Sequence, residues 1–217
     1  MAGRAYLDWN ATAPLRPEAR DAMLDAMALV GNPASVHAEG RAARAMVERA
    51  RAEVAALAGC APAEVVFTSG ATEAARILEQ FGAARGVEVE PTAHDCLWAH
   101  RREGPDSVHA MGLANSETGV ISAIPPGARP LLLDIVQAAG RIPFSFADSG
   151  ADFAILSAHK IGGPKGVGAL IVREGTEVAP LAPGGGQELG RRSGTENIAG
   201  IAGFGAAATA ALADLAA

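Results

Sequence analysis

Short apolar runs alternate with helical segments along this chain, and this alternation constrains its fold more than any other feature. Two longer helices are expected, one from Pro17 to about Leu29 and one from about Ala38 to Ala58. Proline suits a first helical turn, and the apolar residues of the second segment recur at helical spacing. Shorter helices are expected over 70–84 and 95–102. The runs expected to form strands are 64–69, 87–91, 107–114, 130–134, 152–158 and 167–173.

The alternation predicts an α/β domain built around a mostly parallel sheet. The 217 residues suffice for one sizeable core, or for one large and one partial domain. Hydrophobic residues make up 49% of the chain and aromatic residues only 4%, so the core is expected to be aliphatic and rich in alanine. Residues 174–197 are expected to form a long glycine-rich loop, and loops of that length are usually functional.

Charge and cysteine content narrow the class of protein. The net charge of -6 argues against a broad nucleic-acid surface, although a local anion site needs no basic protein. Cys60 and Cys96 have neither metal-binding spacing nor a disulfide framework, which favours a reducing, cytoplasmic setting and no metal site. The N-terminus lacks the apolar segment of a signal peptide. The apolar stretch after Asn197 is built from small residues and contains Asp214, so a packed helix is expected rather than a membrane span.

The stretch SGATEA, residues 69–74, follows a strand and begins a helix. Ser69, Gly70 and Thr72 place small residues and free N–H groups at the positive end of the helix dipole, which is suited to a phosphate. A plain helix N-cap at Ser69 or Thr72 explains the same residues. Taken alone, the cap is the better interpretation.

Polar residues end two further apolar runs. Asp134 ends PLLLD, with Gln137 three residues on, and α/β proteins build sites at the carboxyl ends of parallel strands. Ser157, His159 and Lys160 end the next run, and a lysine there can form a Schiff base with a carbonyl. The ordinary alternatives are a helix-capping aspartate and a solvated loop lysine. The glycines after Lys160 argue against the second, because they let the backbone approach a ligand.

His94 follows a strand at a comparable place, where an imidazole could stack on a flat cofactor or move a proton, although a lone histidine is more often structural. Phosphate seat, strand-end carboxylate, strand-end lysine and flat imidazole together are the parts that pyridoxal phosphate needs. Two competing motifs fail. GGPKGVG lacks the ending of a Walker loop, and GFGAAA at 203–208 follows no strand.

The motifs also resemble a known family. DWNATAPLRPEA, GNPASVHAEGR, FTSGATEA, NSETGV, LLDIVQAAGRIP, SAHKIGGPKGVGAL and GGGQELGRRSGTEN occur in the order found in NifS-type cysteine desulfurases of the class V aminotransferase group. The match covers nearly the whole chain. It implies a three-layer α/β/α fold around a seven-stranded, mainly parallel sheet. It also implies an N-terminal segment (1–14), a pyridoxal-phosphate-binding large domain (15–200) and the start of a helix leading to a small domain (201–217).

The resemblance implies a role for each matching residue. Lys160 would bind the cofactor aldehyde, and His94 would stack on the ring and shuttle protons. Asp134 would face the pyridine nitrogen. The other implied contacts are Gln137 and Ser116 at the ring hydroxyl, Ala71, Thr72, Ser157 and His159 at the phosphate, Thr195 at the phosphate of a neighbouring subunit, and Asn32 near the substrate carboxylate. The activity would be conversion of L-cysteine to alanine and a persulfide, in a homodimer that passes sulfur to an acceptor protein.

The chain also departs from the family pattern. Ala217 lies in the helix that leads to the small domain, so the family's sulfur-accepting cysteine and carboxylate-binding arginine have no counterpart here. Ser116 stands where the family has asparagine. The stretches from His94 to Asn115 and from Glu117 to Asp134 are short, so a trimmed sheet is expected. Cys96 could replace the missing thiol, but a buried small hydrophobe is the commoner role.

Three functions therefore remain open from the sequence. The first is a cysteine desulfurase, expected here as a truncated form or a fragment, whose sulfur would serve iron–sulfur clusters or other pathways. The second is another class V pyridoxal-phosphate enzyme, such as a selenocysteine lyase or an aminotransferase, because fold alone does not select the substrate. The third is a non-catalytic partner protein that keeps the fold. Retention of Lys160, Asp134, Gln137 and His94 argues against the third.

Overall fold

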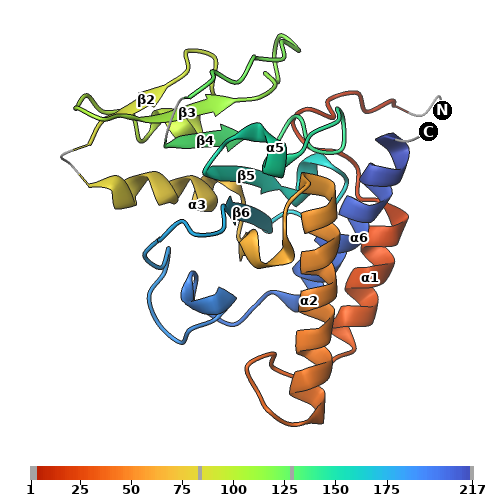
Figure 1. Cartoon of the computed structure of the whole chain (residues 1–217). Coiled ribbons are helices and arrows are strands. Elements are labelled where there is room, and N and C mark those ends of the chain that lie inside the picture. Colours follow the sequence, from red (N-terminus) through yellow and green to blue (C-terminus); the bar gives the residue numbers. More distant parts are fainter. Residues whose placement is uncertain (1–3, 83–84, 128–129, 216–217) are drawn as a thin grey trace.

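The computed structural model describes residues 4–82, 85–127 and 130–215 and contains a six-stranded sheet with helices on both faces (Figure 1). The strand order is β1-β6-β5-β4-β3-β2. β2 to β5 pair in parallel, whereas β6 runs antiparallel to β1 and β5. The predicted three-layer α/β fold is confirmed, with six strands instead of seven. The strands are β1 Val65–Thr68, β2 Val87–Val89, β3 Val108–Gly112, β4 Leu131–Asp134, β5 Phe153–Ser157 and β6 Gly168–Val172.

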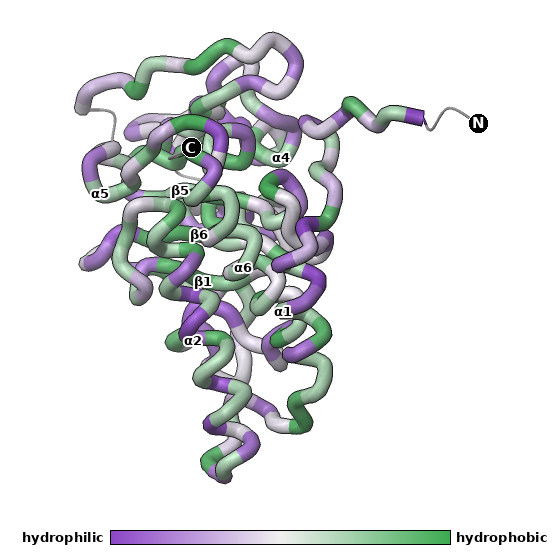
Figure 2. Tube along the Cα trace, turned by 90° about the vertical axis from the view of Figure 1, so that its right-hand side faces the viewer, coloured by the Kyte–Doolittle hydropathy of each residue, from purple (hydrophilic) through white to green (hydrophobic). Residues whose placement is uncertain are grey.

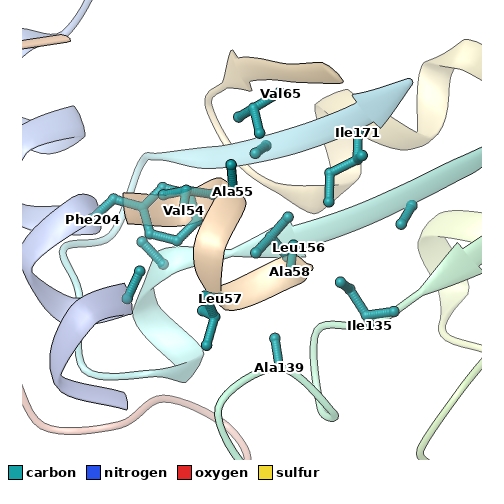
Figure 3. Packing of buried hydrophobic residues seen from close by; sticks show 14 of the residues in the cluster. Val54, Ala55, Leu57, Ala58, Val65, Ile135, Ala139, Leu156, Ile171 and Phe204 are labelled. Atoms are coloured by element: carbon teal, nitrogen blue, oxygen red, sulfur yellow. The ribbon is translucent and has the colours of Figure 1, made fainter. Parts of the chain in front are cut away.

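Two apolar cores lie on opposite faces of this sheet. Successive side chains of a strand point to opposite faces, so Leu131 and Leu133 enter one core while Leu132 enters the other. Every residue of β1, β4, β5 and β6 is buried, as expected for strands covered on both faces. Figure 3 shows the first core, where Val54 and Leu57 of a helix and Phe204 of another pack against strand residues.

The first core is covered by the helices α1 (Pro17–Met27), α2 (Ala38–Ala58) and α6 (Ile198–Leu215), with α1 and α2 both packed against α6. α2 has the predicted boundaries and ends at Gly59 in the left-handed conformation, the usual glycine C-cap. α6 is white to green along most of its length, whereas α1 and α2 alternate between purple and green (Figure 2). α6 is long and apolar enough to cross a membrane by length and composition, but half of it is buried inside the protein. Its packing is that of a core helix, and it begins at Ile198 rather than at residue 201.

The second core is covered by shorter pieces than predicted. The expected helix 70–84 is an α-helical turn, α3 (Ala71–Ala74), followed by a 3-10 segment, η2 (Ala75–Phe81), and residues 83 and 84 lie outside the described residues. The expected helix 95–102 was too long, since α4 spans only Asp95–Trp98. Arg102 forms an antiparallel bridge with Val87 and donates to the Leu78 carbonyl at 3.0 Å. These contacts draw the chain back to the sheet edge and end the helix.

The connection from β3 to β4 differs from an ordinary parallel crossover in that its described residues lack a helix. Residues 113–127 contain no helix, and they are ordered by an isolated bridge between Ala114 and Ile121 and by the hydrogen bonds of Asn115. This supports the expectation of a trimmed domain. Four short elements were not predicted: η1 (Pro62–Glu64), α5 (Phe146–Ser149), η3 (Ala158–Lys160) and, within the glycine-rich loop, η4 (Glu188–Gly190).

The turn between β1 and α3 lies directly against β6. A Cβ atom added at Gly168, the first residue of β6, would lie 2.6 Å from Gly70 Cα and 2.6 Å from the Leu156 carbonyl oxygen. The two glycine backbones are therefore in contact, and no side chain fits between them. This contact positions the SGAT turn (residues 69–72) next to the end of β5, and Lys160 follows that strand.

Gly168→Ala is expected to reduce the free energy of unfolding by about 1–3 kcal/mol, because the extra methyl group overpacks this contact. Gly112→Ala in β3 is the matched control, since its Cβ would meet no atom closer than 3.9 Å. Urea unfolding measures both. An equal loss in the two variants would contradict the role of the Gly70–Gly168 contact.

Candidate active site

The predicted chemical groups gather at one edge of the sheet. Parallel strands place their carboxyl ends together, so Asp134 at the end of β4 and Lys160 just after β5 lie on neighbouring strands. Lys160 ends the short 3-10 turn η3 (Ala158–Lys160). The charges of Lys160 and His94 both act on Asp134, which places the three groups in one electrostatic site.

Lys160 is half-buried, and its amine is held by the N-terminal segment. Its Nζ donates to the Asn10 carbonyl at 2.6 Å, and the same carbonyl accepts from Gln137 Nε2 at 2.9 Å. Burial lowers the pKa of Lys160, and the nearby charge of Arg141 lowers it further, while Asp134 and Asp8 act in the opposite direction. The neutral amine, which is the nucleophilic form, is thus favoured relative to a solvated lysine.

Asp134 is only 8% exposed, and burial raises the pKa of its carboxyl group. The Val136 N–H donates to Oδ1 at 2.9 Å and, with the charges of His94 and Lys160, partly offsets the burial. Within the described part of the chain, Oδ2 receives no hydrogen bond. A buried carboxylate with a free oxygen is prepared for a charged N–H donor from a ligand.

His94 is the N-cap of α4, and its Nδ1 accepts from the Cys96 N–H at 3.1 Å. In its neutral form the ring accepts at Nδ1 and carries its proton on Nε2, so the Cys96 N–H selects this tautomer. Cys96 itself is 7% exposed, and burial, with the nearby Asp134 charge, raises the pKa of its thiol to about 12. Burial likewise raises the pKa of Cys60 to about 12. Both thiols are therefore poor nucleophiles, and the structural interpretation of Cys96 is favoured.

The predicted phosphate seat is the SGAT turn beside the end of β5. Glu73 accepts from the Ser69 N–H at 2.6 Å, and Thr68 Oγ1 donates to the Gly70 carbonyl. Ala71 and Thr72 begin α3, where the first N–H groups have no helical carbonyl to bind. Ser157, across the Gly70–Gly168 contact, makes no hydrogen bond through its hydroxyl among the described residues.

His159 is held from the N-terminal side. Its Nδ1 lies 3.1 Å from Thr12 Oγ1, and its carbonyl accepts from the Ala13 N–H. Burial lowers the pKa of His159, and the charges of Lys160 and Lys165 add to the effect. The ring is therefore predominantly neutral at pH 7 and can donate through one nitrogen.

Ser116 lies on the loop after β3, in a turn organised by Asn115, whose Oδ1 accepts from Glu117 N and Thr118 N. The Ser116 carbonyl accepts from Asn10 Nδ2 at 2.8 Å. The exposed Ser116 hydroxyl contacts only Glu117 among the described residues, at 3.5 Å. Ser116 is thus linked to the other candidate site residues by its backbone carbonyl, through Asn10.

Asn32 and Thr195 are not brought to Lys160 by this chain. Asn32 lies beyond the far end of α1 from the site and accepts from Ala34 N. Thr195 is exposed on the glycine-rich loop. The loops that carry them meet around a separate cavity of about 530 Å³, whose lining includes Pro33, residues 185–189 and Glu196.

A buried ion pair fixes the glycine-rich loop. Arg51 of α2 is 5% exposed and Glu188 is 6% exposed, with Nη1–Oε2 and Nη2–Oε1 distances of 2.7 and 3.0 Å. Arg51 also donates to the Val65 carbonyl, and Glu188 accepts from the Phe67 N–H, both at 2.8 Å. The pair therefore occupies the hydrogen-bonding positions of a missing strand on the outer edge of β1.

Several residues in these contacts had no role assigned from the sequence. They are Asn10, Thr12, Arg141, Arg51 and Glu188. The stretch DWNATAP and the glutamate of GGGQE belong to the motifs that carry the family resemblance, so the motif signal was present. Its physical meaning depends on contacts between segments more than 100 residues apart, such as Asn10 with Gln137 and Arg51 with Glu188.

The sequence and the fold of this chain are both similar to those of known proteins. The family model described as Aminotransferase class-V matches residues 5–90 and 102–215. The chain belongs to this family. A solved structure titled NifS-like protein superposes with a TM-score of 0.91 at 30% identity, covering 99% of this chain and 71% of that one. A NifS-like protein from Rickettsia africae gives 0.90 at 28% identity, covering 98% and 70%.

Curated relatives carry the name cysteine desulfurase. One from Frankia sp. (strain EuIK1) is 42% identical over 256 residues, covering 94% of this chain and 61% of its own length. The cysteine desulfurase IscS of Dictyoglomus turgidum is 34% identical, covering 99% and 66%. This class-V chain thus spans somewhat less than two thirds of these relatives. Because the Frankia alignment is longer than the 217-residue chain, that relative contains internal segments absent here, in agreement with the trimmed crossover.

Asp134→Asn is expected to raise the free energy of unfolding of the ligand-free chain at neutral pH. The same change is expected to weaken the binding of a ligand that donates a charged N–H to this carboxylate. The raised pKa of Asp134 means that the carboxylate opposes folding, and stability falls as pH rises from below the ordinary aspartate pKa through the raised one. The amide removes this penalty and its pH dependence. Thermal unfolding from pH 4 to 8 measures both, and Asp25→Asn on exposed α1 is the control. An unchanged pH profile for Asp134→Asn would contradict the assignment.

Arg51→Met is expected to cost about 3–5 kcal/mol of unfolding free energy, because Glu188 would remain buried without its partner. Arg76→Met is the matched control, since it removes an arginine from an exposed pair with Glu79 and should cost about 1 kcal/mol or less. Chemical denaturation compares the two variants. A small loss for Arg51→Met would show that the pair does not secure the loop.

Proposed function

We propose that this chain binds pyridoxal 5'-phosphate through Lys160 and takes part in cysteine desulfuration. The observation that carries the proposal is the placement of the Lys160 amine and the buried Asp134 carboxylate at the carboxyl ends of neighbouring parallel strands. The cysteine desulfurase names of relatives 34–42% identical support the reaction. A related class V activity on another amino acid is the alternative that the same site would serve.

The residues fit this cofactor. The free oxygen of Asp134 suits a protonated pyridine nitrogen, because a buried carboxylate lacks a charged donor there. Bound through a lysine amine, pyridoxal phosphate supplies a ring that accepts electrons from a bond broken next to an amino group. Gln137 uses one amide N–H on Asn10, so its second N–H remains for the ring hydroxyl. The backbone of Ser116 borders the same region.

The chain's own groups would orient the cofactor and move protons. His94 is the proposed stacking partner and proton carrier, since its tautomer presents a proton at Nε2. Lys160, with its lowered pKa, would supply the neutral amine. The proposed phosphate contacts are the N–H groups of Ala71 and Thr72, the Ser157 hydroxyl and the His159 ring.

A homodimer would complete the site. Thr195 and Asn32 lie on loops away from Lys160, so we propose that Thr195 of the partner subunit reaches the phosphate and that Asn32 acts near a substrate carboxylate. A buried oxygen of Glu196, Oε2, has no hydrogen-bond partner within the described residues and lies at the cavity between these loops.

The proposed substrate is L-cysteine, whose sulfur passes to a thiolate and leaves alanine. The pKa values of about 12 for Cys60 and Cys96 argue that this thiolate is neither of them. We propose that the sulfur then goes to an acceptor protein for iron–sulfur clusters or another pathway, and that the protein works in the cytoplasm.

Lys160→Ala is expected to abolish the visible absorption band that the purified chain gains with pyridoxal phosphate, because no other amine occupies this position. Lys165→Ala, five residues on and exposed, is the control and should keep the band. A folded parent chain without a band, or a band that survives in Lys160→Ala, would contradict the cofactor site. Alanine release from cysteine then tests the reaction itself.

A further inference from the structure

Arg141 lies among the candidate site residues but was assigned no role. Its half-buried guanidinium donates to Asn10 Oδ1 at 2.6 Å and Gln137 Oε1 at 2.5 Å, and to the carbonyls of Trp9 and Lys160 at 3.2 and 3.1 Å. No carboxylate forms an ion pair with Arg141 in the described residues. Burial lowers its pKa without reaching neutrality, since guanidinium stays charged in proteins. A half-buried cation that is matched only by amide oxygens loses hydration without gaining an ion pair, so its position requires a reason.

The acceptors of Arg141 are the groups that hold Lys160. Asn10 receives Arg141 on its side chain and the Lys160 amine on its carbonyl. Gln137 receives Arg141 on Oε1 and donates to that same carbonyl. Arg141 also grips the Lys160 main chain directly. It therefore fixes the lysine at both ends, the backbone by one contact and the amine through Asn10.

The geometry requires the planar fork of arginine. The two terminal nitrogens divide the acceptors, with Nη1 on the side chains of Asn10 and Gln137 and Nη2 on the carbonyls of Trp9 and Lys160. A lysine ammonium carries the same charge but is a single point with three donors. Substitution can therefore separate the two properties of Arg141: Arg141→Lys removes the planar fork and keeps the charge, whereas Arg141→Gln removes both.

We propose that Arg141 is a positioning residue that docks the N-terminal segment 8–13 onto the site and thereby places the Lys160 amine for attack on the cofactor aldehyde. The proposal rests on the proposed function in that it takes Lys160 as the reacting amine. The charge of Arg141 also favours the neutral form of Lys160, together with burial and against Asp134 and Asp8. Hydrogen bonds thus connect the segment 8–13, the Lys160 amine and the Arg141 guanidinium.

Two readouts test this on the intact chain. The first is hydrogen–deuterium exchange of residues 8–13 without cofactor. The second is the rate at which Lys160 is labelled by pyridoxal phosphate and borohydride, followed by peptide mass across pH. In that labelling the amine attacks the aldehyde carbon, water leaves, and borohydride delivers hydride to the carbon–nitrogen double bond.

Arg141→Lys is expected to keep the pH profile of labelling but to speed exchange in the segment and slow labelling, each by about tenfold, because the fork is lost while the charge remains. Arg141→Gln is expected also to move the labelling profile to higher pH. Asn10→Ala should reproduce Arg141→Lys, and the double variant should add little, because both remove one contact. Arg20→Gln on the exposed side of α1 is the control.

The outcomes separate the two proposals. Parent-like exchange and labelling in both Arg141 variants would overturn the positioning role, even if the parent binds the cofactor. A parent chain without any Lys160 label would overturn the proposed function, while the exchange data would still decide whether Arg141 docks the segment. A melting curve for each variant confirms that it is folded.

Discussion

The shared direction of the strands is the constraint on which the site depends. β1 to β5 all run the same way, because the antiparallel β6 reverses the direction twice between β1 and β5. The loops that follow β1, β2, β4 and β5 therefore meet at one edge, with the SGAT turn, His94, Asp134 and Lys160. Because β6 runs the other way, its first residue, Gly168, lies at this same edge, where it meets Gly70.

The charged groups of the candidate site also lower the free energy of unfolding. Within the described part of the chain, Asp134 is buried with one oxygen that receives no hydrogen bond, Lys160 is partly desolvated, and Arg141 is a half-buried cation without a carboxylate partner. Each arrangement weakens folding on its own. Together they leave charged groups that a ligand with an aldehyde and a charged ring N–H would satisfy, which is the physical argument for the proposed cofactor.

The opposite edge of the sheet solves a different problem. β1 is an edge strand, and its free backbone groups at Val65 and Phe67 are bound by Arg51 and Glu188 instead of another strand. The same pair ties down the glycine-rich loop, in which Glu188 and Leu189 have positive φ angles of 51° and 57°. This loop lies beside the cavity that we associate with a second subunit. The same ion pair therefore protects the edge of β1 and holds the loop that would face the partner in the proposed dimer.

The sequence by itself determined the α/β class, the strand positions, both boundaries of α2 and the strand-end residues Asp134 and Lys160, because periodicity and strand-end polarity are local signals. It did not determine the short helices, since Arg102 ends α4 through a contact with Val87 across the sheet edge. Nor did it determine that Asn10 and Arg141 hold Lys160, or that Asn32 and Thr195 lie apart from it. Only the tertiary structure decided these, because they depend on segments that pack together from distant parts of the chain.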